Sequence, residues 1–170
     1  MEGFYSQENE SINIVLVNPE IPPNTGNIAR LCGATKSTLH LVHPLGFKID
    51  DKHLRRAGLD YWDKVEIIHH ESLDSFLETY DDSKFLLFSA RGSRPYTESH
   101  FEPGCFLIFG SETKGLPEHL LKKYQDKTFY IPIWGRVRSL NLSTAVGIVA
   151  YEAYRNIGFG RHWRIPVDQS

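Results

Sequence analysis

Three polar segments of this sequence carry glycines, and each follows a short apolar run of strand length. The first covers residues 22–30 (PPNTGNIAR) and leads into a helical pattern that carries Arg30 one turn in. Free amide groups at a helix start attract anions, and an arginine fork can hold a phosphate through two hydrogen bonds. A helix capped by Thr25 and bearing an ordinary surface arginine would give the same pattern, so both interpretations stay open.

The second segment, residues 109–117 (FGSETKGLP), combines two glycines with a carboxylate. Gly110 and Gly115 permit a close backbone approach or a positive φ angle. Glu112 could bind a ribose hydroxyl or an amine. A plain turn between a strand and a helix explains these residues equally well.

The third segment, residues 131–143 (IPIWGRVRSLNLS), is the richest in groups that could bind a ligand. Capping accounts for one or two of the polar side chains at the start of the following helix pattern. It does not account for all of them beside two arginines and an indole ring. The residues concerned are Trp134, Arg136, Arg138, Ser139, Asn141 and Ser143.

These segments need a scaffold, and the apolar pattern predicts an α/β domain with a mostly parallel, six-stranded sheet flanked by helices. Because ligands bind at the carboxyl ends of such strands, the three segments are expected to meet. The predicted strands are 12–17, 39–42, 65–68, 84–89, 105–109 and 128–131. One helix is predicted to start near Thr25, and four more are predicted over 51–59, 73–80, 117–124 and 141–157. We expect residues 1–11 to be a flexible acidic leader, 12–160 to be one domain and 161–170 to be a C-terminal tail.

Composition limits the function only weakly. The 170 residues are 41% hydrophobic and 24% charged, which is typical of a folded domain, and no apolar run is long enough to span a membrane. The net charge is −2, but four glutamates among residues 1–20 leave 19 basic and 17 acidic side chains elsewhere, so a nucleic-acid partner is not excluded. Cys32 and Cys105 are expected to be reduced core thiols in a cytoplasmic protein, with one disulfide as the alternative.

Several common sites are missing from the sequence. It has no G-x-G-x-x-G, no complete phosphate-binding P-loop, no H-E-x-x-H and no G-x-S-x-G. These absences argue against dinucleotide-dependent, kinase, metalloprotease and serine-hydrolase functions, and no metal site is expected. The pair His69 and His70 is expected to be a solvated strand end.

Taken together, the three segments resemble the motifs of the SPOUT superfamily of S-adenosylmethionine-dependent RNA methyltransferases. NTGNIAR, FGSETKGLP and IP…RSLNLS stand in the order of that family's motifs one, two and three. PEIPPNTGNIARLC and DDKHLRRAGLDY resemble the small tRNA (cytidine/uridine-34)-2′-O-methyltransferases most. The resemblance extends from about residue 12 to about residue 159.

The resemblance implies a deep C-terminal trefoil knot that holds S-adenosylmethionine, and a homodimer that binds the anticodon stem-loop of tRNA. The implied reaction is 2′-O-methylation of the wobble nucleotide, cytidine or modified uridine 34, with leucine isoacceptors as the expected substrates. Alternatives are 2′-O-methylation at another tRNA or rRNA site, a non-catalytic RNA-binding protein of the same fold, or an unrelated small-molecule enzyme.

Site residues follow from the resemblance and from the charge pattern. Arg30, Asn141 and Ser139 are expected to serve catalysis, although a guanidinium stays protonated, so Arg30 should orient the hydroxyl, stabilise an alkoxide or bind phosphate rather than act as a base. Trp134 and Arg136 receive no role because the subgroup varies there. The expected cofactor-binding residues are Phe88, Gly110, Glu112, Ile131, Ser139 and Leu140, and the expected RNA-binding residues are Arg30, Lys52, Arg55, Arg56, Arg91 and Arg138, with Arg94 a further candidate.

Overall fold

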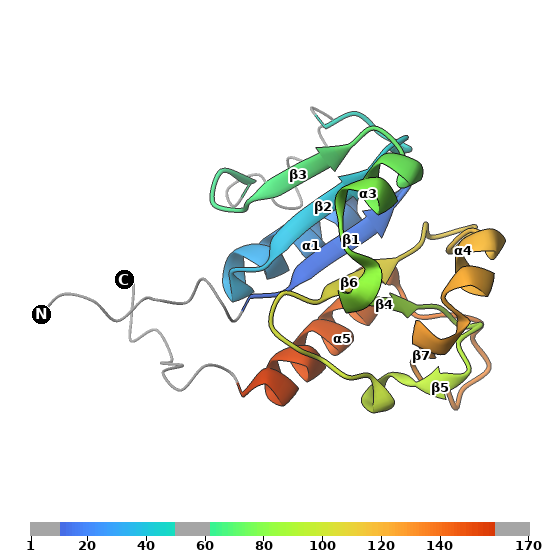
Figure 1. Ribbon diagram of the computed structural model, residues 1–170. Helices are drawn as coiled ribbons and strands as arrows, with labels where there is room; N and C mark the ends of the chain where they lie inside the picture. Colours follow the sequence, from blue (N-terminus) through green and yellow to red (C-terminus); the bar gives the residue numbers. More distant parts are fainter. Residues whose placement is uncertain (1–10, 50–61, 159–170) are drawn as a thin grey trace, which may run out of the picture.

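The computed structural model describes residues 11–49 and 62–158, which form a parallel sheet of seven strands with helices on both faces (Figure 1). The strand order is β3-β2-β1-β6-β4-β7-β5, and every hydrogen-bonded pair in the described sheet is parallel. The strands are β1 (Asn13–Val17), β2 (Thr38–Val42), β3 (Ile67–His70), β4 (Phe85–Phe88), β5 (Arg94–Pro95), β6 (Phe106–Phe109) and β7 (Thr128–Tyr130). The helices are α1 (Pro22–Thr35), α3 (Leu73–Thr79), α4 (Glu118–Lys123) and α5 (Leu142–Ile157), with short 3-10 turns η1 (Asp82–Lys84), η2 (Tyr96–Glu98) and η3 (Gln125–Lys127).

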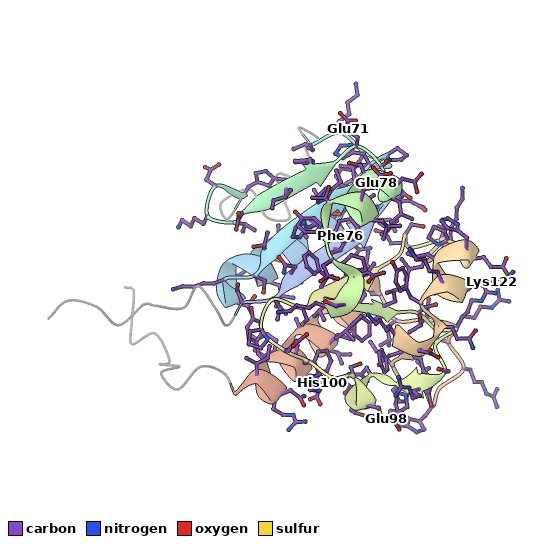
Figure 2. The ribbon with its side chains drawn as sticks, in the orientation of Figure 1. Glu71, Phe76, Glu78, Glu98, His100 and Lys122 are labelled. Carbon is purple, nitrogen blue, oxygen red and sulfur yellow. The ribbon has the colours of Figure 1, made fainter. Side chains whose placement is uncertain are left out.

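Side chains of the strands alternate between two apolar cores, one on each face of the sheet. In β1, Ile14 and Leu16 pack in the core that α1 and α5 cover, whereas Val15 and Val17 pack in the core of α3 and α4. Figure 2 shows Phe76 of α3 inside this second core, with the charged side chains of Glu71, Glu78 and Lys122 on the outside. Burial on both faces explains why the strands read as continuous apolar runs.

The predicted architecture is confirmed, with one strand more than the sequence indicated. The additional strand β5 has only two residues, and it pairs with β7 at the edge of the sheet. Cys32 and Cys105 are buried and free, and burial raises the pKa of their thiols to about 12 and about 11. The leader, the predicted helix 51–59 and the C-terminal tail lie outside the described residues.

The third strand lies two residues further along the chain than predicted, and this shift places two histidines inside the sheet. His69 is exposed near the end of β3, as expected of a solvated strand end, but the expectation is wrong for His70, which is buried. Its partner is His40 of β2, which is only 1% exposed. An apolar pattern cannot reveal this strand end, because its inward side chain is polar and finds its partner on another strand.

Hydrogen bonds fix the protonation of the buried histidine pair. Asn13 Nδ2 donates to the Gly104 carbonyl at 3.1 Å, which leaves Asn13 Oδ1 to accept from His40 Nε2 at 3.1 Å. His40 Nδ1 then accepts from His70 Nε2 at 3.0 Å. The ring of Phe76 packs edge-on against both imidazoles, so an added positive charge on His40 would be poorly solvated.

The buried pair of His40 and His70 predicts that acid lowers the stability of the folded protein. Burial, and then the neighbouring His70, lower the pKa of His40 from 6.5 to about 4. Between these two pH values the unfolded chain binds a proton at His40 that the folded chain does not bind. We therefore expect the free energy of unfolding to fall by up to about 3 kcal/mol as the pH falls from about 6.5 to about 4. Urea denaturation across this range should show the loss in the wild type and in His119→Leu, an exposed control on α4, but a flatter profile in His40→Leu. Parallel profiles for His40→Leu and the wild type would contradict the prediction.

Candidate active site

The carboxyl ends of β4, β6 and β7 meet at one edge of the sheet, and the loops that follow them border an open cavity of about 520 Å³. This volume is typical of small-molecule sites, which span about 300–1,000 Å³. Apolar side chains and loop backbone share its lining. Of the expected site residues, the lining includes Phe88, Arg91, Gly110, Glu112, Ile131, Ser139, Leu140 and Asn141.

The loop after β6 folds back on itself so tightly that only glycine fits at its start. A Cβ atom on Gly110 would lie 2.1 Å from the carbonyl carbon of Gly115 and 2.2 Å from the nitrogen of Leu116. Gly115 has a φ angle of +66°, and its N–H donates to the Ser111 carbonyl at 3.0 Å. Ser111 Oγ also accepts from the Lys114 N–H at 3.2 Å. The two glycines thus allow the close backbone approach that their spacing predicted.

Helix α1 starts at Pro22 rather than near Thr25, and a distant carboxylate completes its first turn. Ile21 occupies the N-cap position and has no side-chain oxygen to offer. Glu112, from the loop after β6, accepts from the Glu20 N–H at 2.8 Å and from the Ile21 N–H at 3.0 Å. Thr25 is not the cap; its hydroxyl is buried and finds no hydrogen-bond partner among the described residues. Glu112 therefore holds the start of α1, and each of its oxygens accepts at least one hydrogen bond from the protein.

Asn24 joins all three segments through its amide group. Its Nδ2 donates to Glu112 at 3.2 Å, and its Oδ1 accepts from Asn141 Nδ2 at 3.0 Å. The Oδ1 atom of Asn141 in turn caps α5, accepting from Ser143 N at 2.9 Å and from Thr144 N at 3.4 Å. Asn24 is 5% exposed. Asn24 belongs to the first segment but received no predicted role, because nothing local in the sequence shows that it faces the other two segments.

A charge at Asn24 should disrupt this junction. Asn24→Asp keeps the shape of the side chain but replaces the donor facing Glu112 with a second carboxylate. We expect a loss of about 2–4 kcal/mol in the free energy of unfolding at neutral pH, with partial recovery in mild acid as one carboxyl takes up a proton. Chemical denaturation measures this, and Asn27→Asp, an exposed change on the same helix, is the matched control. Equal stability of the two variants would contradict the proposed junction.

The expected RNA-binding residues are more scattered. Arg30 is exposed on α1 and is not among the residues that line the cavity. Arg91 lines the cavity and lies 3.7 Å from Glu118, whereas Arg138 is exposed on the loop after β7. Arg94 donates to the Asp126 carbonyl at 2.6 Å and is thereby held at the sheet edge. Lys52, Arg55 and Arg56 lie outside the described residues.

No group of three or more histidine, cysteine, aspartate or glutamate side chains among the described residues is placed to hold a metal ion. No helix within the same residues combines the length and the apolar character that a membrane span requires.

Comparisons with known proteins point to one family. Residues 11–151 match the model of the SpoU rRNA methylase family. The chain is 45% identical over 150 residues to a tRNA (cytidine(34)-2′-O)-methyltransferase from Burkholderia ambifaria, covering 86% of this chain and 96% of that protein. It is also similar to a solved structure described as giving insight into the 2-OH methylation of C/U34 on tRNA, with a TM-score of 0.81, 46% identity, and coverage of 86% of this chain and 96% of that one.

A more distant structure shares the fold alone. The S-adenosylmethionine-bound rRNA methyltransferase from Sinorhizobium meliloti is 24% identical, with a TM-score of 0.78. The match covers 86% of this chain and 57% of that one.

Proposed function

Since the chain belongs to the SpoU methylase family of SPOUT methyltransferases, we propose that it transfers a methyl group from S-adenosylmethionine to the ribose 2′-oxygen of nucleotide 34 in tRNA. The observation that carries the proposal is the cavity of about 520 Å³ at which all three motif segments meet. We further propose that the nucleotide is cytidine or a modified uridine and that leucine isoacceptors are the substrates.

The lining of the cavity fits an adenosine-bearing cofactor. Leu116, Ile131 and Leu140 offer apolar walls for a base, and the tight backbone around Gly110 and Gly115 offers amide and carbonyl groups for its polar edge. The cofactor supplies a methyl group activated by a sulfonium, which becomes a neutral thioether on transfer. Glu112 lines the cavity while it holds the start of α1, and we propose that its remaining acceptor capacity serves the cofactor.

The residues of this chain contribute mainly by positioning. Asn141 ties the start of α5 to Asn24, so the polypeptide around Ser139 and Leu140 is held against the loop after β6. This pre-organisation serves an in-line displacement, in which the acceptor oxygen must lie behind the methyl carbon. We propose that Arg30 aligns the 2′-hydroxyl or stabilises the developing alkoxide, while the proton leaves to solvent.

Assembly and location complete the proposal. Arg30 lies outside the cavity lining of its own chain, which supports a homodimer in which a second copy brings this side chain to the acceptor. Membership of the family also leads us to propose the C-terminal trefoil knot. The free, buried thiols of Cys32 and Cys105 support work in the reducing cytoplasm.

The decisive experiment is methyl transfer from labelled S-adenosylmethionine to tRNA from cells that lack this methylation, followed by nuclease digestion and mass spectrometry. We expect a single 2′-O-methylated nucleoside at position 34. Label at another position would retain the reaction and overturn the substrate. Absence of both transfer and cofactor binding, measured by calorimetry, would instead favour a non-catalytic RNA-binding protein.

A further inference from the structure

The loop between β7 and α5 exposes apolar surface that nothing in the described chain covers. Trp134 is 92% exposed and Val137 is 64% exposed, more than the other large hydrophobic side chains found exposed in the structure, Ile21 and Tyr151. An indole left in water at such a place is unusual, since aromatic side chains normally bury their surface. Residues 134–138, which we term the Trp134 loop, therefore have the character of a contact surface.

The charge of the Trp134 loop indicates the chemistry of its partner. Arg136 and Arg138 are both exposed, and no ion pair within the described residues engages either guanidinium. The sequence contains no aspartate or glutamate between Asp126 and Glu152. The loop and its flanking segments thus carry apolar, aromatic and basic side chains but no acidic ones, and this composition favours an anionic partner that also has flat apolar faces.

The position of the Trp134 loop relates this surface to the cavity. Ile131 and Ile133, just before the loop, line the cavity, and so do Ser139, Leu140 and Asn141, just after it. The residues of the loop itself are not in the lining. The loop therefore leaves and re-enters the wall of the cavity, so its exposed side chains lie beside the site.

We infer that the Trp134 loop binds single-stranded RNA beside the reacting nucleotide, with a base stacked on the Trp134 indole and phosphates held by Arg136 and Arg138. Every base has a π face, so stacking on tryptophan tolerates any sequence, and the arginines supply the charge. The inference deepens the proposed function and rests on it where the RNA is taken to be tRNA.

A second copy of the chain is the competing occupant of this surface, and the charge pattern disfavours it. In a two-fold symmetric interface the same patch lies on both sides, so a patch whose only charged side chains are Arg136 and Arg138 would face like charges. Protein–protein interfaces also favour arginine and tryptophan, but nucleic-acid interfaces are much more positively charged, as this surface is.

Substitutions at Trp134 test the stacking. Trp134→Ala should weaken binding of a labelled anticodon stem-loop RNA by about 5- to 100-fold, measured by fluorescence anisotropy, whereas Trp134→Phe should stay close to the wild type. In the methyl-transfer assay KM for tRNA should rise in Trp134→Ala, with kcat and the affinity for S-adenosylmethionine little changed. Tyr151→Ala, an exposed aromatic change on α5, is the matched control.

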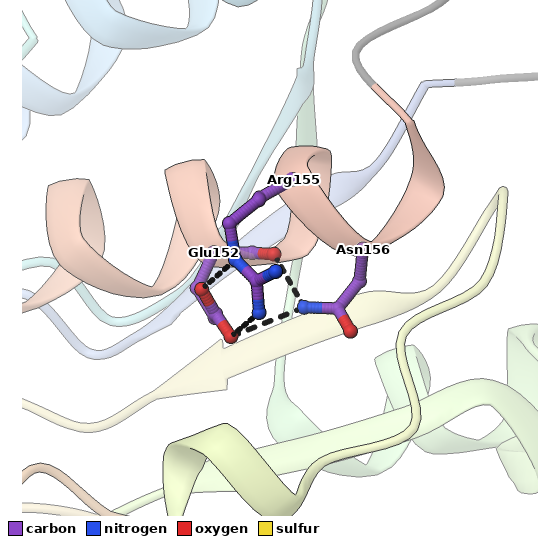
Figure 3. A network of polar contacts seen from close by, with 3 residues as sticks. All are labelled: Glu152, Arg155 and Asn156. Carbon is purple, nitrogen blue, oxygen red and sulfur yellow. Dashed lines mark hydrogen bonds and ion pairs between the residues drawn. The ribbon is translucent and has the colours of Figure 1, made fainter.

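The salt dependence of binding tests the arginines. Arg136→Gln and Arg138→Gln should each lower the slope of log affinity against log salt by about 0.7, because each removes one phosphate contact. Arg155→Gln is the control: this exposed arginine is held at 2.8 Å by Glu152 on α5, beside Asn156 (Figure 3), and its loss should leave the slope unchanged.

The outcomes separate this inference from the proposed function. Methylation of position 34 by the wild type together with unaltered RNA binding by Trp134→Ala would overturn the inference and leave the function. RNA binding that depends on Trp134, without methyl transfer to any tRNA, would support the inference and overturn the function. A change from dimer to monomer in Trp134→Ala, seen by sedimentation, with unaltered RNA affinity would assign the loop to contact between copies and also overturn the inference.

Discussion

Replacement of Arg30 by lysine is expected to lower methyl transfer to tRNA by about 100- to 1,000-fold. The substitution keeps the positive charge but loses the planar fork that can bind two oxygens at once. Calorimetry should show an unchanged affinity for S-adenosylmethionine, because Arg30 is not among the residues that line the cavity. The measurement is single-turnover transfer to unmethylated tRNA at saturating cofactor.

A matched substitution shows whether the effect is specific to Arg30 or follows from replacing any exposed arginine by lysine. Arg155→Lys changes another exposed helical arginine and should leave the rate unchanged. Transfer at the wild-type rate by Arg30→Lys would show that its charge alone suffices or that another group aligns the hydroxyl. Weakened cofactor binding in this variant would show instead that Arg30 acts on the cavity.

Replacement of Gly110 by alanine is expected to lower methyl transfer by a similar factor, for a steric reason. The new methyl group would lie 2.1 Å from the carbonyl carbon of Gly115, so the loop after β6 must move away. The atoms concerned are backbone atoms, which cannot yield as a flexible side chain does. We expect a loss of about 3 kcal/mol in stability and a fall of about 100-fold or more in methyl transfer, since this loop forms one wall of the cavity and carries Glu112.

Gly147→Ala provides the internal comparison for this prediction. Gly147 lies within α5, and a Cβ atom there would meet nothing within 4 Å. Because alanine favours the helical backbone over glycine, this variant should gain about 0.5–1 kcal/mol in stability. Thermal unfolding and calorimetry with S-adenosylmethionine measure both variants. A Gly110→Ala protein that binds the cofactor as the wild type does would show that the loop can relax without consequence.

The sequence predicted those parts of the molecule whose signals are local. Helix α5 was predicted within one residue at its start, because an apolar stripe, the N-cap Asn141 and the C-terminal Gly158 lie close together along the chain. The meeting of the three segments was also predicted, because parallel strands place their carboxyl ends at one edge of the sheet. The two-residue strand β5 was missed, since so short a strand has no pattern of its own.

Features that depend on distant partners could not be predicted. The pairing of His40 with His70 depends on the register of β2 against β3, and a single sequence does not give that register. The use of Glu112 at the start of α1 depends on a contact across 91 and 92 positions in the chain. A glutamate in a glycine-rich loop is compatible with a ligand contact, and only the fold shows that it also accepts hydrogen bonds from the backbone of another segment.

The dependence of α1 on Glu112 also has a consequence for the order in which the protein forms. During synthesis, α1 emerges from the ribosome long before the strand β6 and the glutamate that follows it. Until Glu112 arrives, the amide groups of Glu20 and Ile21 must remain with water, and the first turn is open to fraying. The cavity therefore cannot be assembled one segment at a time from the N-terminus. In a nascent chain that stops before the loop after β6, the first turn of α1 would lack its hydrogen-bond acceptor. The site would therefore form late and in a single step.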